Sequence, residues 1–150
     1  MMSEEAEMGQ DQLNYELAVY REQIAMIKRE TERVSLTTID LTNALKTVEN
    51  LQGGEALIPI GGGALARGAI SNTMILVPIG AEYLLEMDKD MAADEMKRRI
   101  DATKKAVEKL NVEFNRIASK LREVSGQLQK IEVADQINQR VEGNIREDYI

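Results

Sequence analysis

The glycines of segment 61–66 (GGGALA) are the residues of this chain whose spacing most resembles a chemical motif. The segment satisfies the G-x-G-x-x-G/A pattern that binds the pyrophosphate of dinucleotides, and it follows a short apolar run. That chemistry requires a helix to begin at the glycines, so that its N-terminus faces the phosphates. Here Gly68 and Ser71 limit the next segment to strand length, and no Gly-Lys-Ser/Thr forms a P-loop. The motif therefore predicts a tight turn and no nucleotide site.

The other side-chain types needed for catalysis are absent or dispersed. The chain has no His and no Cys. It therefore lacks the commonest general base near neutral pH, any thiol or disulfide, and the usual ligands of zinc. Its Lys, Asp and Glu residues are spread along periodic segments, where solvation is their ordinary role. We expect no enzyme activity, no cofactor and no metal.

A Gly- and Pro-rich apolar block, from Gly53 to Glu86, separates two charged and periodic segments. Within it we expect strands over 57–60 and 64–70, joined by a turn at 61–63. A second pair of strands is expected over 74–79 and 81–87, with its turn around Pro78-Ile79-Gly80 and a connecting turn at 71–73. The block at 55–87 is thus predicted to form two β-hairpins.

The flanking segments each carry an apolar seam in alternating steps of four and three residues. The first runs from Leu13 to Val48 with threonines at 31 and 38, and the second runs from Met96 to Ile131. This spacing keeps one stripe facing a partner helix, as in a coiled coil. The seams have equal lengths, so helices at 10–52 and 88–142 are predicted to fold back as an antiparallel pair. The fold class expected is α+β, mostly α: a long coiled-coil helical hairpin with two β-hairpins between its helices.

Composition supports an elongated molecule outside the membrane. Only 3% of the residues are aromatic, which disfavours a thick core, and the net charge of −7 disfavours non-specific binding of nucleic acid. The acidic leader 1–9 is expected to be disordered and does not resemble a signal peptide. Residues 10–150 are expected to form a single domain with a tail at 143–150. We expect a cytoplasmic protein without a membrane span.

The apolar pattern changes register after Ile131, where both ends of the chain are expected to meet at one tip. A new stripe appears at Val133, Ile137, Val141 and Ile145, with no equally long apolar segment to cover it. One interpretation is a pair of frayed helix ends with scattered apolar residues. The other is an exposed apolar surface that binds a partner. For the second, the candidate residues are Met8, Leu13, Tyr15, Leu17, Val19, Ile131, Val133, Ile137, Val141 and Ile145.

Two short hairpins bury little apolar surface by themselves, since isolated hairpins are marginal in water. We therefore expect other chains to cover them. The candidate assembly residues are Leu57, Ile58, Ile60, Leu65, Ile70, Met74, Leu76, Val77 and Ile79.

The order helix, two hairpins, helix resembles the prefoldin family, specifically its archaeal α-class subunits. The resemblance covers roughly residues 10–140 and is strongest in ALIPIGGG (56–63), NT (72–73), VPIGA (77–81) and EMDKD (86–90). It implies that two copies of this chain pair through their hairpins with four β-class chains, on a shared β-barrel platform. It further implies an ATP-independent chaperone that binds unfolded or nascent polypeptides at the tips and delivers them to a group II chaperonin.

The alternative hypothesis is a coiled-coil scaffold or tether in another multiprotein complex. A scaffold would use the same helices to bind one folded partner tightly. It would not suppress the aggregation of unfolded proteins, which distinguishes the two hypotheses.

Overall fold

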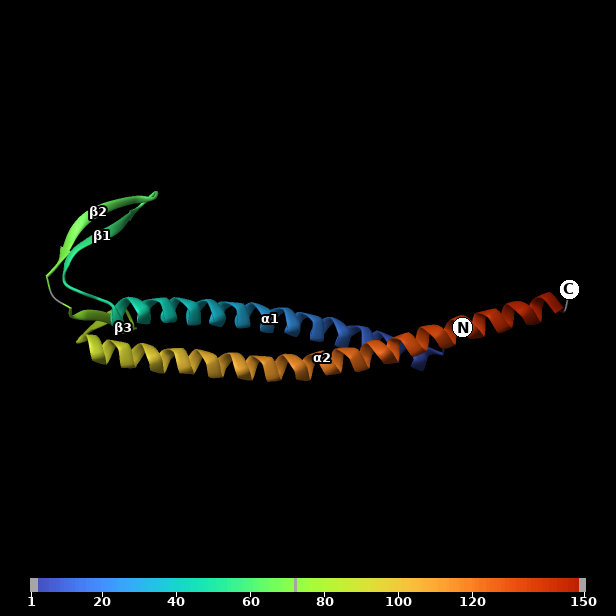
Figure 1. Cartoon of the computed structure of the whole chain (residues 1–150). Helices are drawn as coiled ribbons and strands as arrows, with labels where there is room; N and C mark the ends of the chain where they lie inside the picture. Colours follow the sequence, from blue (N-terminus) through green and yellow to red (C-terminus); the bar gives the residue numbers. More distant parts are fainter. Residues whose placement is uncertain (1–2, 72, 149–150) are drawn as a thin grey trace. The chain divides into compact units, whose positions relative to one another are not determined.

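The computed structural model describes residues 3–71 and 73–148, with side chains through residue 145. Two long helices, α1 (Glu4–Glu49) and α2 (Lys89–Asp148), pack together (Figure 1). The segment that connects them along the chain forms two β-hairpins. The strands are β1 (Gly54–Gly61), β2 (Ala64–Ile70), β3 (Ile75–Gly80) and β4 (Tyr83–Met87). The expected α+β, mostly helical fold class is confirmed.

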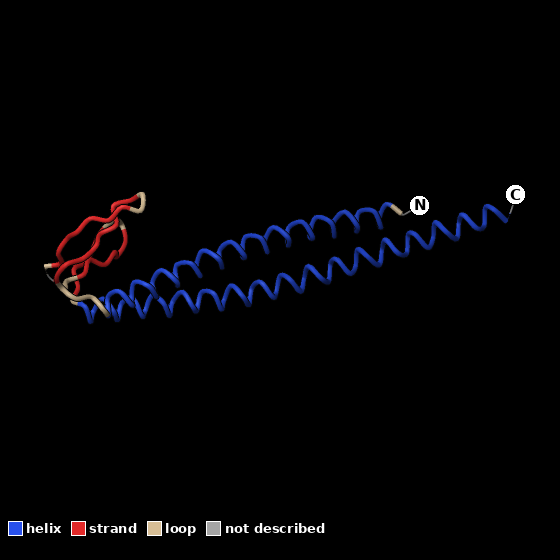
Figure 2. The backbone as a smooth tube through the Cα atoms, turned by 45° about the horizontal axis from the view of Figure 1, so that its top comes forward, coloured by secondary structure: helices blue, strands red, loops and turns tan. Residues whose placement is uncertain are grey.

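The chain divides into two compact units. The tip unit consists of residues 1–32 and 108–150, and the hairpin unit of residues 33–107. In each unit a part of α1 lies beside a part of α2 (Figure 2). The pairing is antiparallel in both. In the tip unit, Lys28 lies over Phe114 and Ala6 lines a groove together with Ile131. In the hairpin unit, Thr38 contacts Thr103 and Glu49 lies 3.8 Å from Lys97.

The predicted seams face the partner helix in both units. Every seam position from Leu13 to Val48 and from Met96 to Ile131 is buried or half-buried. The most shielded are Ile117, Val124 and Leu128 in the tip unit and Val48 and Ile100 in the hairpin unit. A seam of this kind removes one apolar stripe of each helix from water and leaves the rest of the helix solvated.

The seam of the hairpin unit contains one polar layer. Thr38 Oγ1 donates a hydrogen bond to Thr103 Oγ1 at 2.8 Å, and Thr103 Oγ1 donates to the carbonyl of Ile100, also at 2.8 Å. Thr38 Oγ1 also lies 3.0 Å from the carbonyl of Val34. A polar pair inside a coiled-coil seam matches only one alignment of the helices, and so fixes their register.

The two hairpins are built alike. Each has a Pro-Ile-Gly segment at the end of its first strand, with a register shift across Pro59/Gly61 in one and Pro78/Gly80 in the other. The two residues after the Gly form the turn, and both have positive φ: 58° and 77° at Gly62 and Gly63, 49° and 64° at Ala81 and Glu82. These are the conformations of a type I′ turn, which matches the twist of the strands it joins.

The second turn lies two residues later than predicted. Pro78 is paired with Leu84 inside the β3–β4 ladder, and the turn is made by Ala81 and Glu82. The prediction around 78–80 was wrong because it treated Pro and Gly as turn residues. Proline is tolerated here because a two-stranded sheet consists of edge strands only. β1 also begins three residues before the predicted strand, and the expected turn at 71–73 includes Asn72, which lies outside the described residues.

One hairpin packs on the helices and the other does not. Val77 and Met87 of the β3–β4 hairpin are buried in a small core with Val48, Ala92 and Ala93, against which Leu45, Ile75 and Met96 pack. The last seam position of α1, Val48, and the first of α2, Met96, thus lie in the same cluster. Arg99 strengthens this contact by donating from its guanidinium to the carbonyl of Pro78 at 2.7 Å. The β1–β2 hairpin contributes no residue to this core.

The helices extend further than predicted at the chain ends. Residues 4–9, expected to be disordered, form the first turns of α1, and α2 continues six residues past the expected end at 142. Ser3 caps α1, since its Oγ accepts a hydrogen bond from the amide of Ala6 at 3.3 Å. Asp88 caps α2, because its carboxylate accepts a hydrogen bond from the amide of Met91 at 2.8 Å. Within residues 3–71 and 73–148, neither long helix carries an apolar stretch that could cross a membrane.

The Thr38–Thr103 pair yields a first testable prediction. Thr38→Val or Thr103→Val alone removes the hydrogen bond between the two hydroxyls and should lower the free energy of unfolding by about 0.5–1 kcal/mol. The double variant replaces both hydroxyls by methyl groups of the same shape and should be at least as stable as the original chain. Urea denaturation of all four proteins measures this coupling, and additive losses in the double variant would contradict it.

The turn at Ala81 yields a second prediction. A non-glycine residue at positive φ is strained, and Ala81 is exposed, so Ala81→Gly should stabilise the β3–β4 hairpin by about 1 kcal/mol. Ala81→Val should destabilise it, because β-branched residues tolerate this conformation worse. Thermal unfolding followed by circular dichroism gives the order of stability. Equal midpoints for the three proteins would rule out the strain.

Candidate functional site

The end of the tip unit carries most of the residues expected to bind a partner. We define the tip surface as residues 3–19 of α1 together with residues 131–145 of α2. The four side chains of the new stripe, at Val133, Ile137, Val141 and Ile145, are between 49% and 54% exposed. Single exposed apolar residues are ordinary on protein surfaces, but four in successive turns of one helix form a continuous surface.

The remaining candidates of the tip surface differ in exposure. Met8 and Tyr15 project from α1 with 67% and 71% of their surfaces exposed. Leu13, Leu17 and Ile131 are half-buried because they belong to the seam, and Val19 is half-buried as well. These four candidates can offer only part of a side chain to a partner.

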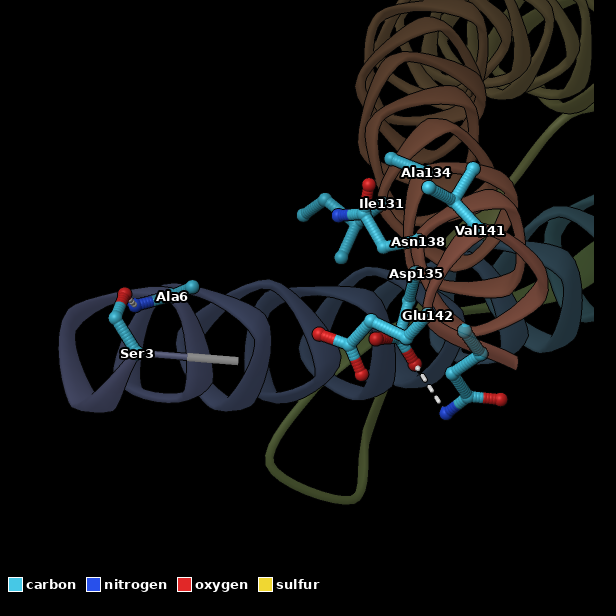
Figure 3. A pocket seen from close by; sticks show the side chains of 9 residues that line it. Ser3, Ala6, Ile131, Ala134, Asp135, Asn138, Val141 and Glu142 are labelled. Carbon is cyan, nitrogen blue, oxygen red and sulfur yellow. Dashed lines mark hydrogen bonds between the residues drawn. The ribbon is translucent and has the colours of Figure 1, made fainter. Parts of the chain in front are cut away.

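A groove opens where α1 begins beside α2. It has a volume of about 420 Å³ (Figure 3). Ser3 and Ala6 line it from α1, and the lining residues of α2 are Ile131, Ala134, Asp135, Asn138, Gln139, Val141 and Glu142. The amide of Gln139 donates to a carboxylate oxygen of Asp135 at 3.4 Å. The groove therefore combines apolar groups with two carboxylates.

The apolar residues of α2 at the tip line two separate hollows. Ile131 and Val141 line the groove, whereas Val133 and Ile137 line a second, shallow hollow of about 480 Å³ that also includes Gly126 and Lys130. The absence of a side chain at Gly126 widens this hollow, since no atom lies within 4 Å of where its Cβ would be. The tip surface thus offers two neighbouring depressions on α2.

Sequence reasoning missed part of the groove. Ser3 and Ala6 were assigned to a disordered leader, although Ser3 followed by acidic residues is a helix-start signal. Asp135, Asn138 and Glu142 carried no apolar signal, and only the structure places them beside Ile131 and Val141.

A few charged groups along the helices form ion pairs. Arg116 hydrogen-bonds to Glu113, which lowers the pKa of the Glu113 carboxyl and raises the pKa of the Arg116 guanidinium. Glu95 bonds to Arg99 at 3.0 Å, and Lys97 lies 3.8 Å from Glu49. Exposed pairs of this kind stabilise a protein little, and none is arranged as a catalytic group. In the described part of the chain, no three acidic side chains lie close enough to bind a metal ion.

The hairpins carry the second group of candidates. Leu57, Ile58, Ile60, Leu65, Met74, Leu76 and Ile79 are all exposed, and Ile70 is half-buried. The inclusion of Val77 was wrong: it is 2% exposed, because its side chain points into the core with Val48 and Met87. Tyr83, Leu84 and Leu85 of β4 were missed, although they are exposed and apolar.

Comparison with known proteins agrees with this architecture. The family model for prefoldin subunits matches residues 20–134. A prefoldin subunit alpha of Methanococcus vannielii is 25% identical over 76% of this chain and 80% of that protein. A prefoldin subunit alpha of Methanobrevibacter smithii is 27% identical over 89% of this chain and 94% of that protein. One of Pyrobaculum arsenaticum is 34% identical over 69% of this chain and 68% of that protein.

Solved structures show the same fold. The filamentous PFD of Methanocaldococcus jannaschii matches with a TM-score of 0.65 at 19% identity, covering 75% of this chain and 98% of that one. The prefoldin beta subunit of Thermococcus strain KS-1 matches with a TM-score of 0.58 at 18% identity, covering 81% and 90%. On the family match and its alpha-subunit relatives, the chain belongs to the prefoldin family, as an alpha-class subunit of a non-enzymatic chaperone.

Proposed function

We propose that this chain binds unfolded or nascent polypeptides through its tip surface, without ATP, and transfers them to a group II chaperonin in the cytoplasm. The observation that carries the proposal is the half-exposed stripe at Val133, Ile137, Val141 and Ile145. An unfolded polypeptide exposes apolar segments, and covering them prevents aggregation. The stripe has the chemistry to do this and has no covering segment in the described part of the chain.

The stripe alone would bind weakly. Full burial of a Val or Ile side chain contributes about 1.5–3 kcal/mol, so a half-exposed one has about 1 kcal/mol left to gain. Four such side chains give at most about 4 kcal/mol, so the dissociation constant is no lower than about 1 mM, and the loss of freedom on association weakens binding further. Several tips acting on one polypeptide raise the apparent affinity without new contacts. Weak individual contacts also allow release without any chemical step.

The need for several tips leads to the proposed assembly. Family membership implies a complex with other prefoldin subunits. We propose two copies of this chain with four β-class chains, joined through the hairpins. The β1–β2 hairpin supports this arrangement, because it exposes Leu57, Ile58, Ile60 and Leu65 and contributes nothing to the core. Both edges of each hairpin can also accept strands from other chains.

The tip assignment is tested with Ile137→Ser/Val141→Ser in the assembled complex. The expected result is a clear loss of suppression when an unfolded protein is diluted into the mixture, since about half of the available apolar contact is removed. Light scattering measures the aggregation, and native mass spectrometry checks that the complex remains assembled.

Met26→Ser/Val112→Ser is the matched control, because Met26 and Val112 are 55% and 70% exposed and lie outside the tip surface. This control should suppress aggregation as the original complex does. Full suppression by the 137/141 variant would reject the tip assignment. Tight binding of a single folded partner, without suppression, would favour a scaffold.

The hairpin assignment is tested with Leu57→Ser/Ile60→Ser. These side chains are exposed in the single chain, so the variant should retain its thermal stability but fail to form the complex in native mass spectrometry. Val77→Ala, in contrast, should destabilise the single chain. It removes buried methyl groups and should lower the free energy of unfolding by about 2 kcal/mol. A 57/60 variant that assembles normally would contradict the proposed interface.

A further inference from the structure

The tip surface is acidic as well as apolar. Residues 3–20 contain five carboxylates, at Glu4, Glu5, Glu7, Asp11 and Glu16, and no Lys or Arg. The first four are exposed and Glu16 is half-buried. On α2, Asp135 and Glu142 line the groove, which no Lys or Arg lines. The lining of the groove therefore combines apolar and neutral polar side chains, and its charged side chains are all negative.

These carboxylates have no cationic partner among the described side chains, unlike three acidic residues elsewhere in the chain. Glu49, Glu95 and Glu113 each form an ion pair with a Lys or Arg. None of the tip carboxylates forms an ion pair with a residue whose side chain the structure describes. Their negative charge is available to a bound molecule.

Helix stabilisation explains only some of this charge. Glu4, Glu5 and Glu7 lie in the first turn of α1, where carboxylates interact favourably with the helix dipole. That effect fades beyond the first turn, so it does not apply to Asp11. It does not apply to Asp135 or Glu142 either, since both lie in the C-terminal third of α2.

An aromatic ring lies beside the acidic groups. Met8, Asp11 and Tyr15 follow one another at helical spacing and share one exposed face of α1. A carboxylate one turn from an exposed tyrosine can attract a cation and place it over the ring, where a cation–π interaction adds to the attraction. This face thus also suits a positively charged group.

We propose that the tip surface selects unfolded segments in which apolar residues are flanked by Lys or Arg. The apolar residue enters the groove beside Ile131 and Val141, and the flanking cation meets Asp135 and Glu142 or the Asp11–Tyr15 face. This inference rests on the proposed client-binding function and adds the class of client. Complementary charge raises the rate of encounter and suppresses binding of like-charged segments.

The test uses two unstructured peptides with the same apolar residues, one flanked by lysines and the other by glutamates. Their dissociation constants for the assembled complex are measured by fluorescence anisotropy. We expect the lysine peptide to bind at least tenfold more tightly at low ionic strength, with the difference shrinking as salt screens the charges. Equal affinities for the two peptides would overturn the inference.

Asp11→Asn/Asp135→Asn/Glu142→Gln is the informative variant, because it leaves the first turn of α1 unchanged. It should weaken binding of the lysine peptide about tenfold and leave the glutamate peptide unchanged or tighter. The control, Asp40→Asn/Asp101→Asn/Glu108→Gln, removes three exposed carboxylates outside the tip surface and should change neither affinity. An equal effect of both variants would indicate net charge alone and would also overturn the inference.

Ile137→Ser/Val141→Ser separates this inference from the proposed function. If it weakens both peptides while the charge variant changes nothing, the tip binds clients by apolar contact and only the charge preference is wrong. If neither peptide depends on Ile137 and Val141, the tip assignment itself fails. If the lysine peptide binds more tightly than the glutamate peptide and each variant weakens its binding, both conclusions are supported.

Discussion

The interhelical seam is the constraint on which the rest of this structure depends. Two helices can bury only one stripe each against one another, so a molecule of this design has no interior in which other apolar residues can be covered. Apart from the small core at the β3–β4 hairpin, many apolar side chains outside the seam remain at the surface, at the tip, on the hairpins and along the helices. In a compact globular protein such residues would be a defect. In this chain they supply the surfaces that we propose for binding to other molecules.

The two hairpins show how similar local structure leads to different packing. Both use a Pro-Ile-Gly segment and a two-residue turn with positive φ. The β3–β4 hairpin is packed on the helices because Val77 and Met87 reach the end of the seam and Arg99 binds its backbone. The β1–β2 hairpin has no equivalent contact. One hairpin is therefore part of the core of the single chain, while the other contributes no residue to it, and a hairpin by itself is marginal in water.

Much of this architecture could be predicted because coiled coils follow a simple periodicity. The seams from Leu13 to Val48 and from Met96 to Ile131 were correct at every position, since spacing alone decides which residues face the partner. The second turn was misplaced because local Pro and Gly signals were given more weight than the repeat of Pro-Ile-Gly. Val77 was misassigned because alternation along a strand does not say which face has a partner. The tip groove depends on where α1 begins, which the seam does not determine.

The end of the seam also limits how the tip can bind. A surface made from half-exposed side chains on two helices cannot enclose a ligand, so each tip gains little from any one apolar residue. Charge adds discrimination at low cost, because exposed carboxylates are already solvated and attract cations over a distance of about 10 Å at moderate salt. The acidic groups at Asp135 and Glu142 stand beside the apolar groups of Ile131 and Val141. If the tip binds unfolded segments as proposed, this arrangement lets a weak site distinguish between them without binding any of them too tightly to release.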